Sequence, residues 1–196
     1  PVGGWEAAGD GLFQAPLAWD LVDENQLFAG EAMLTEARWP NIQGTLLAPT
    51  RARVASGLPT TIVDPQPPGD DDFWKGAVLW CAGGHRWYCW SATVTAFDAR
   101  TKTLTFDKPQ PDDWYTPRQG NEYVLMGIRH ALDAEGEWWL DRQTKTLWLK
   151  PSGGQDPNTL KIEAKRRRYT MDLSGRAHVR VAGLGFRAGG ILTDAN

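Results

Sequence analysis

The stretch GEWWLDRQTKTLWLKP, residues 136–151, decides the fold that the sequence predicts. Two short apolar arms flank a polar segment that begins at Asp141, an arrangement typical of a β-hairpin. An aspartate at the first position of a turn can accept hydrogen bonds from the backbone that follows it. The segment from Asp98 to Phe106 repeats this aspartate and the run Thr-Lys-Thr-Leu. The repeat indicates one type of turn used twice, and its short span does not establish a repeat architecture.

The position of the turn determines which side chains of the hairpin at 136–151 share a face. If residues 141–145 form the turn, Leu140 pairs with Leu147, and side chains alternate between the two faces from there. The face expected to point into the core carries Trp138, Leu140, Leu147 and Leu149. Trp139 and Trp148 then form a cross-strand aromatic pair on the opposite face. Two alternatives are open for this pair: it packs against another layer of the protein, or it is an exposed platform for a ligand.

The composition narrows the class of protein. The 196 residues have a net charge of −3, with 21 basic and 24 acidic residues, which argues against a nucleic-acid partner. No apolar run reaches the roughly 20 residues of a membrane span, so no membrane partner is expected. Gly and Pro, 21 and 13 residues, are frequent enough to punctuate many short strands. The chain is therefore expected to be all-β, with one domain or slightly more.

Alternating apolar residues and turn signals divide most of the chain into short strands. A hairpin is expected over residues 25–34, with its turn at Ala29 and Gly30. Other strands are expected over 73–80, 87–97, 103–106, 122–129, 137–140 and 146–150. Segments 48–72 and 108–121 are rich in Pro, Gly and Asp and are predicted to be loops. Residues 129–135 are the single weak candidate for a helix.

Cys81 and Cys89 flank a predicted turn at Gly83 and Gly84. Equal parity along the two arms allows a hairpin disulfide, which would suit an exported protein. The alternative is two free thiols, half-buried in the hairpin. With His85 the two cysteines offer three metal ligands, but the spacing matches no standard zinc pattern and lacks a fourth ligand, so no metal is expected.

The last third of the sequence has a different character. Short β-type runs at residues 169–173, 179–181, 184–186 and 191 alternate with glycines that mark corners. Three short strands with tight corners in about 22 residues are typical of one coil of a parallel β-helix. Because a coil buries its inward side chains only against neighbouring coils, the chain is expected to be the N-terminal part of a longer β-helix, or to meet a capping partner. The predicted organisation is a leading segment over 1–19, an antiparallel β-sandwich-like domain over 20–160, and the start of a right-handed parallel β-helix over 161–196.

Three segments carry a resemblance to a known group of proteins: NQLFAGEAMLTEARWPN, ALDAEGEWWLDRQTKTLWLKPSGG and YTMDLSGRAHVRVAGLGFRAGG. They resemble the N-terminal region of secreted bacterial right-handed parallel β-helix proteins of polysaccharide breakdown. That group includes β-xylosidase-type glycoside hydrolases and a xylan-binding, non-catalytic β-helix module. The resemblance implies a secreted protein and a sandwich-like domain beside the early coils. It carries over no catalytic residue, because the carboxylates of the hydrolases lie on later coils.

The carboxylates of the chain match no catalytic motif. Glycoside hydrolysis needs two carboxyl groups, about 5–5.5 Å apart for retention and 6.5–9.5 Å for inversion. Glu135 with Glu137, and Asp112 with Asp113, are candidate pairs that are more simply interpreted as solvated turn residues. Residues 70–72, three consecutive aspartates, lack the spacing of a calcium loop. No catalytic residue and no cofactor is predicted.

Sugar binding asks for aromatic rings beside planar polar groups, because a pyranose presents an apolar C–H face and a rim of hydroxyls. The loop DDWYTPRQGN, residues 112–121, has this composition, and loops bear function more often than they need indoles for packing. The predicted carbohydrate-binding residues are Trp114, Tyr115, Arg118, Asn121, Trp139, Trp148, Trp87 and Trp39.

The sequence therefore predicts non-catalytic binding of a plant cell-wall polysaccharide, with xylan indicated by the resemblance. The protein would be secreted and attached to a catalytic domain or to the rest of a β-helix. One alternative is the non-catalytic N-terminal part of a β-helix glycoside hydrolase whose active site lies beyond residue 196. A third interpretation is a structural region that caps a β-helix and neither binds nor cleaves glycan.

Overall fold

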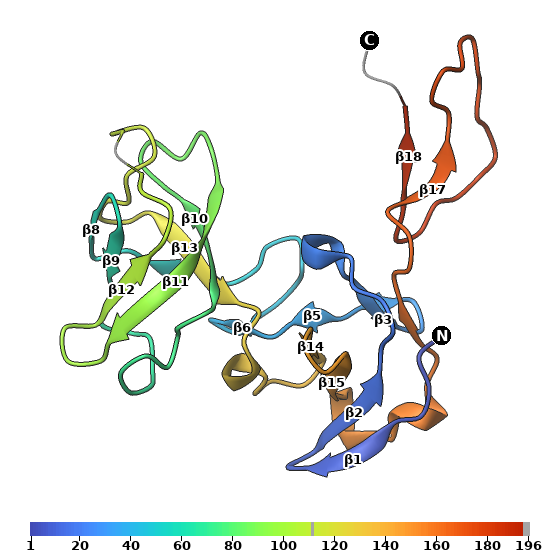
Figure 1. Cartoon of the computed structure of the whole chain (residues 1–196), viewed down its shortest axis with the longest axis horizontal. Helices are drawn as coiled ribbons and strands as arrows, with labels where there is room; N and C mark the ends of the chain where they lie inside the picture. Colours follow the sequence, from blue (N-terminus) through green and yellow to red (C-terminus); the bar gives the residue numbers. More distant parts are fainter. Residues whose placement is uncertain (111, 194–196) are drawn as a thin grey trace. The chain divides into compact units, whose positions relative to one another are not determined.

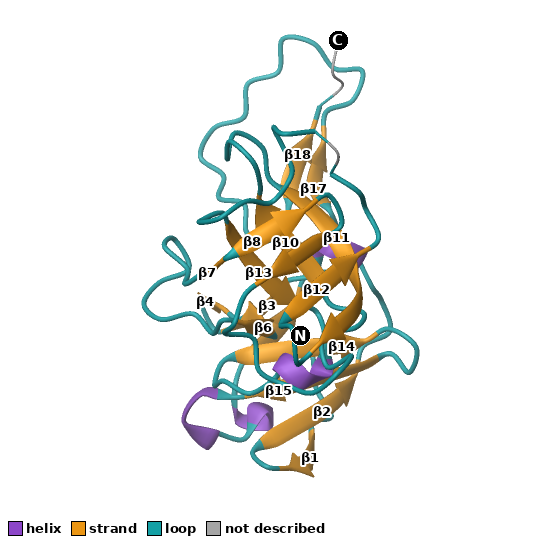
Figure 2. Ribbon diagram, turned by 90° about the vertical axis from the view of Figure 1, so that its left-hand side faces the viewer, coloured by secondary structure: helices purple, strands orange, loops and turns teal. Residues whose placement is uncertain are grey.

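A computed structural model describes residues 1–110 and 112–193 and confirms the predicted all-β class (Figures 1 and 2). Apart from strands, the regular structure in these residues is limited to four single turns of 3-10 helix. These turns are Val22–Glu24, Arg129–Ala131, Ser152–Gly154 and Pro157–Thr159. The weak helix candidate at 129–135 is thus one turn long. Within the described ranges no helix is long and apolar enough to cross a membrane.

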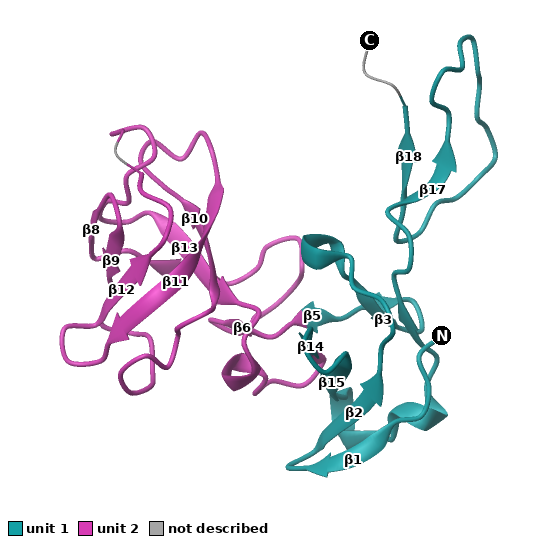
Figure 3. Cartoon of the chain, in the orientation of Figure 1, with its two compact units in different colours: residues 1–35, 140–196 teal, residues 36–139 magenta. Residues whose placement is uncertain are grey.

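The chain forms two compact units (Figure 3). Unit 1 contains residues 1–35 and 140–196, and unit 2 contains residues 36–139. Unit 2 is therefore an insertion in the sequence of unit 1. The predicted boundaries at 19/20 and 160/161 describe a different division, into sandwich and coil, and stay a prediction.

Unit 1 is built from short, mostly antiparallel strands. Its strands are β1 (Glu6–Gly9), β2 (Leu12–Pro16), β3 (Leu27–Ala29), β4 (Ala32–Met33), β15 (Thr146–Lys150), β16 (Ile162–Ala164), β17 (Tyr169–Asp172) and β18 (Gly190–Leu192). One sheet has the order β1-β2-β15-β14-β5, and the chain passes between the units within β5 (Thr35–Glu36) and β14 (Glu137–Asp141). A second sheet has the order β16-β3-β4, and the β3–β4 pair is the predicted hairpin around Gly30.

Unit 2 is dominated by one antiparallel sheet in the order β6-β13-β10-β11-β12-β9-β8, with β7 also paired to β13. Its strands are β6 (Arg38–Trp39), β7 (Ala52–Arg53), β8 (Ser56–Leu58), β9 (Thr61–Val63), β10 (Val78–Ala82), β11 (Trp90–Asp98), β12 (Thr103–Phe106) and β13 (Glu122–Met126). The order leaves β6 and β8 as the two ends of the sheet in the described part of the chain. No described sheet closes into a barrel.

The two repeated turns have the same hydrogen bonds, as the sequence predicts. The Asp98 carboxylate accepts the backbone N–H groups of Arg100 and Thr101, at 2.9 and 2.8 Å. The Asp141 carboxylate accepts those of Gln143 and Thr144, at 2.9 and 3.2 Å. In both turns these donors hold the pKa of the aspartate below its usual value, because they stabilise the charged form. The predicted burial pattern is also confirmed: Trp138, Leu140, Leu147 and Leu149 are buried.

Two strand predictions need correction at their starts. The strand predicted over 73–80 begins only at Val78, because residues 73–77 turn to bury the indole of Trp74. The Trp74 Nε1 donates to the carbonyl oxygen of Pro68 at 2.8 Å, so a loop and not a strand holds this ring. The strand predicted over 87–97 begins at Trp90 and leaves residues 83–89 as a loop.

The C-terminal third departs most from its prediction. β17 and β18 do pair in parallel, with Met171 opposite Ile191. The number of residues between these two strands is the number expected for one coil. The runs expected at 179–181 and 184–186 are not strands, and Val179 and Leu184 are more than half exposed. A single parallel pair gives these side chains no neighbouring coil to pack against, so the predicted parallel β-helix is not shown.

Candidate functional site

An exposed group of aromatic rings lies on two loops of unit 2. The β10–β11 loop carries His85, Trp87 and Tyr88, and the β12–β13 loop carries Trp114 and Tyr115. We call these five residues the aromatic platform. Trp87 is 83% exposed and Tyr88 is 60% exposed, although large apolar side chains usually avoid water on a monomer. Exposed rings of this kind lower the solubility of a protein and do not stabilise its core, so ligand binding is the usual reason for them. The platform is therefore the strongest candidate site in the described part of the chain.

Ring contacts connect the two loops. The centroid of the Trp114 ring lies 4.7 Å from that of His85 and 5.1 Å from that of Trp87. The rings of Tyr88 and Tyr115 meet edge to face, with centroids 5.7 Å apart. These separations fall in the range of attractive aromatic pairs, so each ring restricts the orientation of its neighbour. Because these contacts need no ligand, they favour a pre-arranged platform, and pre-arrangement lowers the entropy cost of binding.

The β12–β13 loop owes its shape to Asp112. The Asp112 carboxylate accepts the backbone N–H of Trp114 at 2.8 Å, and its carbonyl accepts those of Tyr115 and Thr116 at 2.9 and 2.8 Å. This is the local bonding that favours aspartate in tight turns. It places Trp114 and Tyr115 at the tip of the turn.

Two glycines let the loops approach each other closely. The Gly84 N–H donates to the carbonyl of Thr116 at 3.0 Å, and the His85 N–H donates to that of Trp114 at 3.3 Å. A methyl group on Gly83 would overlap the carbonyl oxygen of Tyr115, and one on Gly84 would overlap that of Trp114. Only residues without a Cβ fit at this contact, which explains the two consecutive glycines in the β10–β11 loop.

Side chains add further links between the loops. Trp90 Nε1 donates to the carbonyl of Tyr115 at 3.0 Å, and Arg86 donates to the carbonyl of Gly120. Asn121 is 1% exposed, and its amide donates to the carbonyl of Gly84 at 3.0 Å. Asn121 therefore supports the loop from inside and offers no face to a ligand.

Polar groups stand around the rings. Asp113, Arg118 and Gln119 are exposed in the same loop as Trp114. The Arg118 guanidinium donates to the carbonyl of Asp113, which positions it while other N–H groups of the fork are free to donate elsewhere. Apolar rings flanked by an acceptor and several donors are the chemistry that binds the C–H face and hydroxyls of a sugar.

The structure brings together four of the predicted site residues, Trp87, Trp114, Tyr115 and Arg118, with Asn121 beneath them. The other three lie elsewhere. Trp39 is half-buried against Trp74 and Tyr123, with ring centroids 6.0 and 6.1 Å away. Trp139 is half-buried, and its Nε1 donates to the carbonyl of Gly127 at 3.0 Å. Trp148 is half-buried in β15, opposite Gln14 of β2.

Sequence reasoning did not select His85 and Tyr88. Tyr88 falls in the strand predicted over 87–97, where it would share a face with Trp90, a residue that is buried. His85 lies between the predicted turn at Gly83-Gly84 and that strand. The signal that could have found them is the pair Gly83-Gly84, because two glycines before a run of aromatic residues permit a close loop–loop contact.

Of the two alternatives for the cysteines, the structure has the free thiols and not the hairpin disulfide. Cys81 is buried and Cys89 is exposed, so neither thiol is half-buried as expected. Cys81 pairs with Trp90 across β10 and β11, so Cys89 lies outside the ladder and is exposed. Burial raises the pKa of the Cys81 thiol to about 12, and the nearby Cys89 adds to this. In the described part of the chain no three His, Cys, Asp or Glu side chains are grouped to hold a metal ion.

The candidate carboxylate pairs have structural surroundings. Glu137 is 3% exposed, and its carboxylate accepts the backbone N–H groups of Asp133 and Ala134 at 3.3 and 3.2 Å. Burial raises the pKa of Glu137 to about 7, and the charge of Asp133 acts in the same direction against these donors. Such a pKa suits a general acid, but the Glu137 carboxyl is turned toward the backbone, and Glu135 is exposed.

The run of three aspartates also has a structural role. Asp71 accepts the backbone N–H of Ala99 at 2.8 Å, and Asp72 accepts that of Phe97 at 3.3 Å. Asp72 also pairs with Lys75 at 3.3 Å. These carboxylates therefore tie a loop to the end of β11.

The titration of Glu137 predicts a pH dependence of stability. The folded pKa of about 7 lies above the ordinary value of 4.5, so the folded state binds more protons than the unfolded state between these values. We expect the contribution of Glu137 to the free energy of unfolding to be greatest below about pH 4.5. This contribution should fall by on the order of 3 kcal/mol as the pH rises to about 7. Urea unfolding at pH 5 and pH 8 measures the difference.

Glu137→Gln provides the comparison, because the amide oxygen can still accept the two backbone N–H groups and does not ionise. The decrease between pH 5 and pH 8 should be smaller in this variant by the contribution of Glu137. Glu135→Gln, at an exposed position, should leave the pH dependence unchanged. An equal decrease in the wild type and in Glu137→Gln would show that Glu137 ionises at its ordinary pKa.

Comparison with known proteins gives one structural likeness. No protein-family model and no curated protein matches the chain. A solved structure described as a glycoside hydrolase matches with a TM-score of 0.57 and 17% identity, over 83% of this chain and 30% of that chain. The chain thus has the fold of part of a glycoside hydrolase and spans less than a third of that protein's length.

Proposed function

We propose that the chain binds polysaccharide without cleaving it, through stacking and hydrogen bonds at the aromatic platform. The observation that carries the proposal is the group of exposed rings that contact one another across two loops, with Trp87 83% exposed. The likeness to a glycoside hydrolase supports a glycan-related role. The resemblance of the sequence to secreted β-helix proteins supports a plant cell-wall polysaccharide, with xylan as the specific ligand, and a secreted protein.

The same resemblance supports a parallel β-helix that begins at β17 and β18, beside an antiparallel sandwich-like domain. The parallel pairing of Met171 with Ile191 is the observation in its favour. In this proposal further coils, or an attached catalytic domain, accompany the chain. The boundaries of the sandwich and of the first coil would then follow the predicted positions near residue 160.

Trp114→Ala tests the proposal. Removing an aromatic ring from the centre of a binding surface should weaken the affinity for xylo-oligosaccharide by about tenfold or more. Trp87→Ala should act in the same direction, because it removes the most exposed ring of the platform. Isothermal titration of the whole chain measures both dissociation constants, and affinity electrophoresis in soluble xylan, mixed-linkage glucan, mannan and pectin identifies the preferred polymer.

Tyr169→Ala is the matched control. Tyr169 and Trp114 are both 47% exposed, but Tyr169 lies in unit 1, outside the platform. Its removal should leave the affinity unchanged. Equal affinities for the wild type, Trp87→Ala and Trp114→Ala would exclude the platform as the binding surface.

A second proposal is that the chain is the non-catalytic part of a longer β-helix glycoside hydrolase. This proposal is favoured by the match to a glycoside hydrolase, because the match covers only 30% of that protein's chain. A reducing-sugar assay of the longer protein separates the two proposals. Hydrolysis would support the enzyme, and retardation by xylan with no sugar release would support the binding module.

A further inference from the structure

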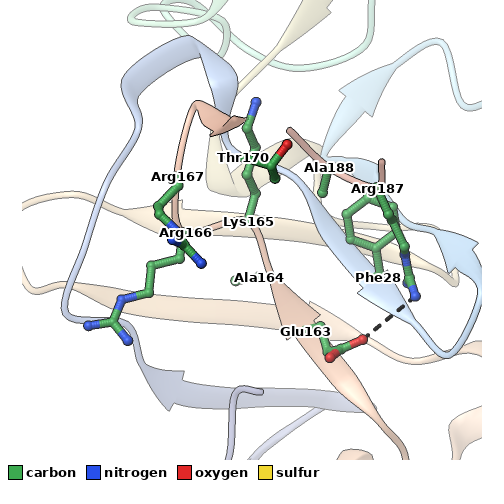
Figure 4. A pocket seen from close by; sticks show the side chains of 9 residues that line it. All are labelled: Phe28, Glu163, Ala164, Lys165, Arg166, Arg167, Thr170, Arg187 and Ala188. Atoms are coloured by element: carbon green, nitrogen blue, oxygen red, sulfur yellow. Dashed lines mark ion pairs between the residues drawn. The ribbon is translucent and has the colours of Figure 1, made fainter. Parts of the chain in front are cut away.

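A pocket of about 240 Å³ lies in unit 1, whereas the aromatic platform belongs to unit 2 (Figure 4). Its floor is the backbone around Ala164, and Phe28 and Ala188 provide apolar wall. The other lining residues are Glu163, Lys165, Arg166, Arg167, Thr170 and Arg187. The volume lies just below the roughly 300–1,000 Å³ of pockets for larger ligands, so it suits one small ring.

The pocket concentrates positive charge. Four cationic side chains line it against one carboxylate, Glu163, although the whole chain has a net charge of −3. A local excess of cations that opposes the charge of the chain attracts anions and raises their concentration at the surface.

Two of the four cations are already paired within unit 1. The Lys165 ammonium lies 3.1 Å from Glu24, which also pairs with Arg168 at 3.3 Å. Arg187 lies over the ring of Phe28, with 4.5 Å to the centroid, and pairs with Glu31 at 3.4 Å and Glu163 at 3.7 Å. These contacts fix Lys165 and Arg187 and neutralise much of their charge.

Arg166 and Arg167 differ from them. Both are exposed, and neither forms an ion pair with a carboxylate in residues 1–110 and 112–193. The Arg166 guanidinium lies over the ring of Trp19, 5.4 Å from the centroid, and the Trp19 Nε1 donates to the carbonyl of Lys165 at 2.7 Å. Arg166 is thus held by a ring and not by a counter-charge. Two guanidinium groups beside a pocket are available to an external anion.

We propose that this pocket binds the carboxylate of an acidic sugar, a uronic acid residue of a polysaccharide. The proposal rests on the proposed glycan binding, and it adds a second subsite in a different unit with a different chemistry. The guanidinium fork matches the two oxygens of a carboxylate, which makes arginine the preferred partner for this group. The pyranose ring then lies along Phe28 and Ala188. The Thr170 hydroxyl donates to the carbonyl of Gly190 at 3.1 Å, so its oxygen can accept a hydrogen bond from a sugar hydroxyl. A carboxylate is the common anionic group of plant polysaccharides, which favours it over phosphate.

The test is the binding of tetragalacturonate to the whole chain, measured by isothermal titration at 20 mM and 500 mM NaCl. The double variant Arg166→Gln/Arg167→Gln should weaken the affinity at low salt by about tenfold or more, because it removes charge-assisted hydrogen bonds to the ligand. The wild-type affinity should fall at high salt, because exposed charges are screened.

The matched control is Arg53→Gln/Arg100→Gln. It removes the same two charges from exposed side chains, with 68% and 85% exposure, that lie in unit 2. The control should change the affinity less than about twofold, since rim charges away from the ligand contribute little. Equal losses in the two double variants would overturn the pocket as the site and show non-specific attraction.

Three further outcomes test the assignment of the pocket. Competition by millimolar sulfate or phosphate as strong as that by glucuronic acid would overturn the sugar assignment and show a general anion site. Binding of tetragalacturonate without binding of neutral xylotetraose would contradict the platform proposal and leave this one standing. Absence of tetragalacturonate binding at low salt, with xylotetraose bound at the platform, would overturn this inference alone.

Discussion

Replacing Trp74 with alanine is expected to lower the free energy of unfolding by about 3–5 kcal/mol, the usual cost of removing a buried aromatic side chain. Trp74 is 1% exposed, and its ring meets Phe73 edge to face with centroids 5.1 Å apart. The ring also lies 6.0 Å from Trp39, and the Nε1–Pro68 hydrogen bond would be lost with it. The variant leaves a cavity that neighbouring strands can fill only in part. Urea unfolding followed by circular dichroism measures the loss.

Trp87→Ala is the control for this prediction, because it removes the same side chain from a position that is 83% exposed. It should change the free energy of unfolding by no more than about 0.5 kcal/mol, as surface substitutions do. Similar losses in the two variants would mean that Trp74 is not in the core of unit 2. The pair also separates stability from binding, since Trp87 is expected to matter only for the ligand.

Gly83→Ala is expected to abolish most of the glycan affinity, by about tenfold or more, because the ordered aromatic surface would be lost. The new methyl group would overlap the carbonyl oxygen of Tyr115, and the indole nitrogen of Trp90 lies 2.7 Å from the same position. The two loops must then separate, which breaks the contact between Trp87 and Trp114. Overpacking of this kind costs about 1–3 kcal/mol, so the fold should survive. Xylo-oligosaccharide titration and near-ultraviolet circular dichroism measure the two effects.

Gly185→Ala is the matched substitution, because no atom lies within 4 Å of its added methyl group and the glycine has no positive φ angle. It should alter neither the affinity nor the aromatic signal. Full affinity in Gly83→Ala, together with a changed aromatic signal, would show that binding does not need the two loops to be joined.

Local chemistry explains why part of the fold could be predicted. The strands at 103–106 and 146–150 have the predicted bounds, because each follows an aspartate turn whose hydrogen bonds close within a few residues. The alternation of buried and half-buried side chains in the second hairpin follows from strand geometry alone. In such segments both partners of each hydrogen bond lie within a few residues of each other, so the local sequence is enough to predict the turn.

Long-range contacts explain the rest. The pairing of β2 with β15 joins Ala15 to Leu147, and no pattern within either segment announces its partner. The platform illustrates the same point for function. Loop composition selected Trp114 and Tyr115, and Trp87 was also predicted, but Trp87 and Tyr88 were expected in a strand, so the contact between two loops was not foreseen. Asn121 was predicted as a sugar-binding residue because its amide can donate hydrogen bonds. In the structure Asn121 is buried, and its amide donates to the carbonyl of Gly84 instead.

The insertion of unit 2 within unit 1 has a consequence for the order of events during synthesis. The N–H of Ala37 donates to the carbonyl of Trp138 at 2.7 Å, so the two ends of unit 2 are bonded to each other. A ribosome completes unit 2 before it makes β15, and β2 has no partner on that side until then. Unit 2 can therefore fold while the first 35 residues wait, as expected of domains that fold as they emerge. Once folded, it holds the two halves of unit 1 near each other and reduces the entropy lost when β2 and β15 meet.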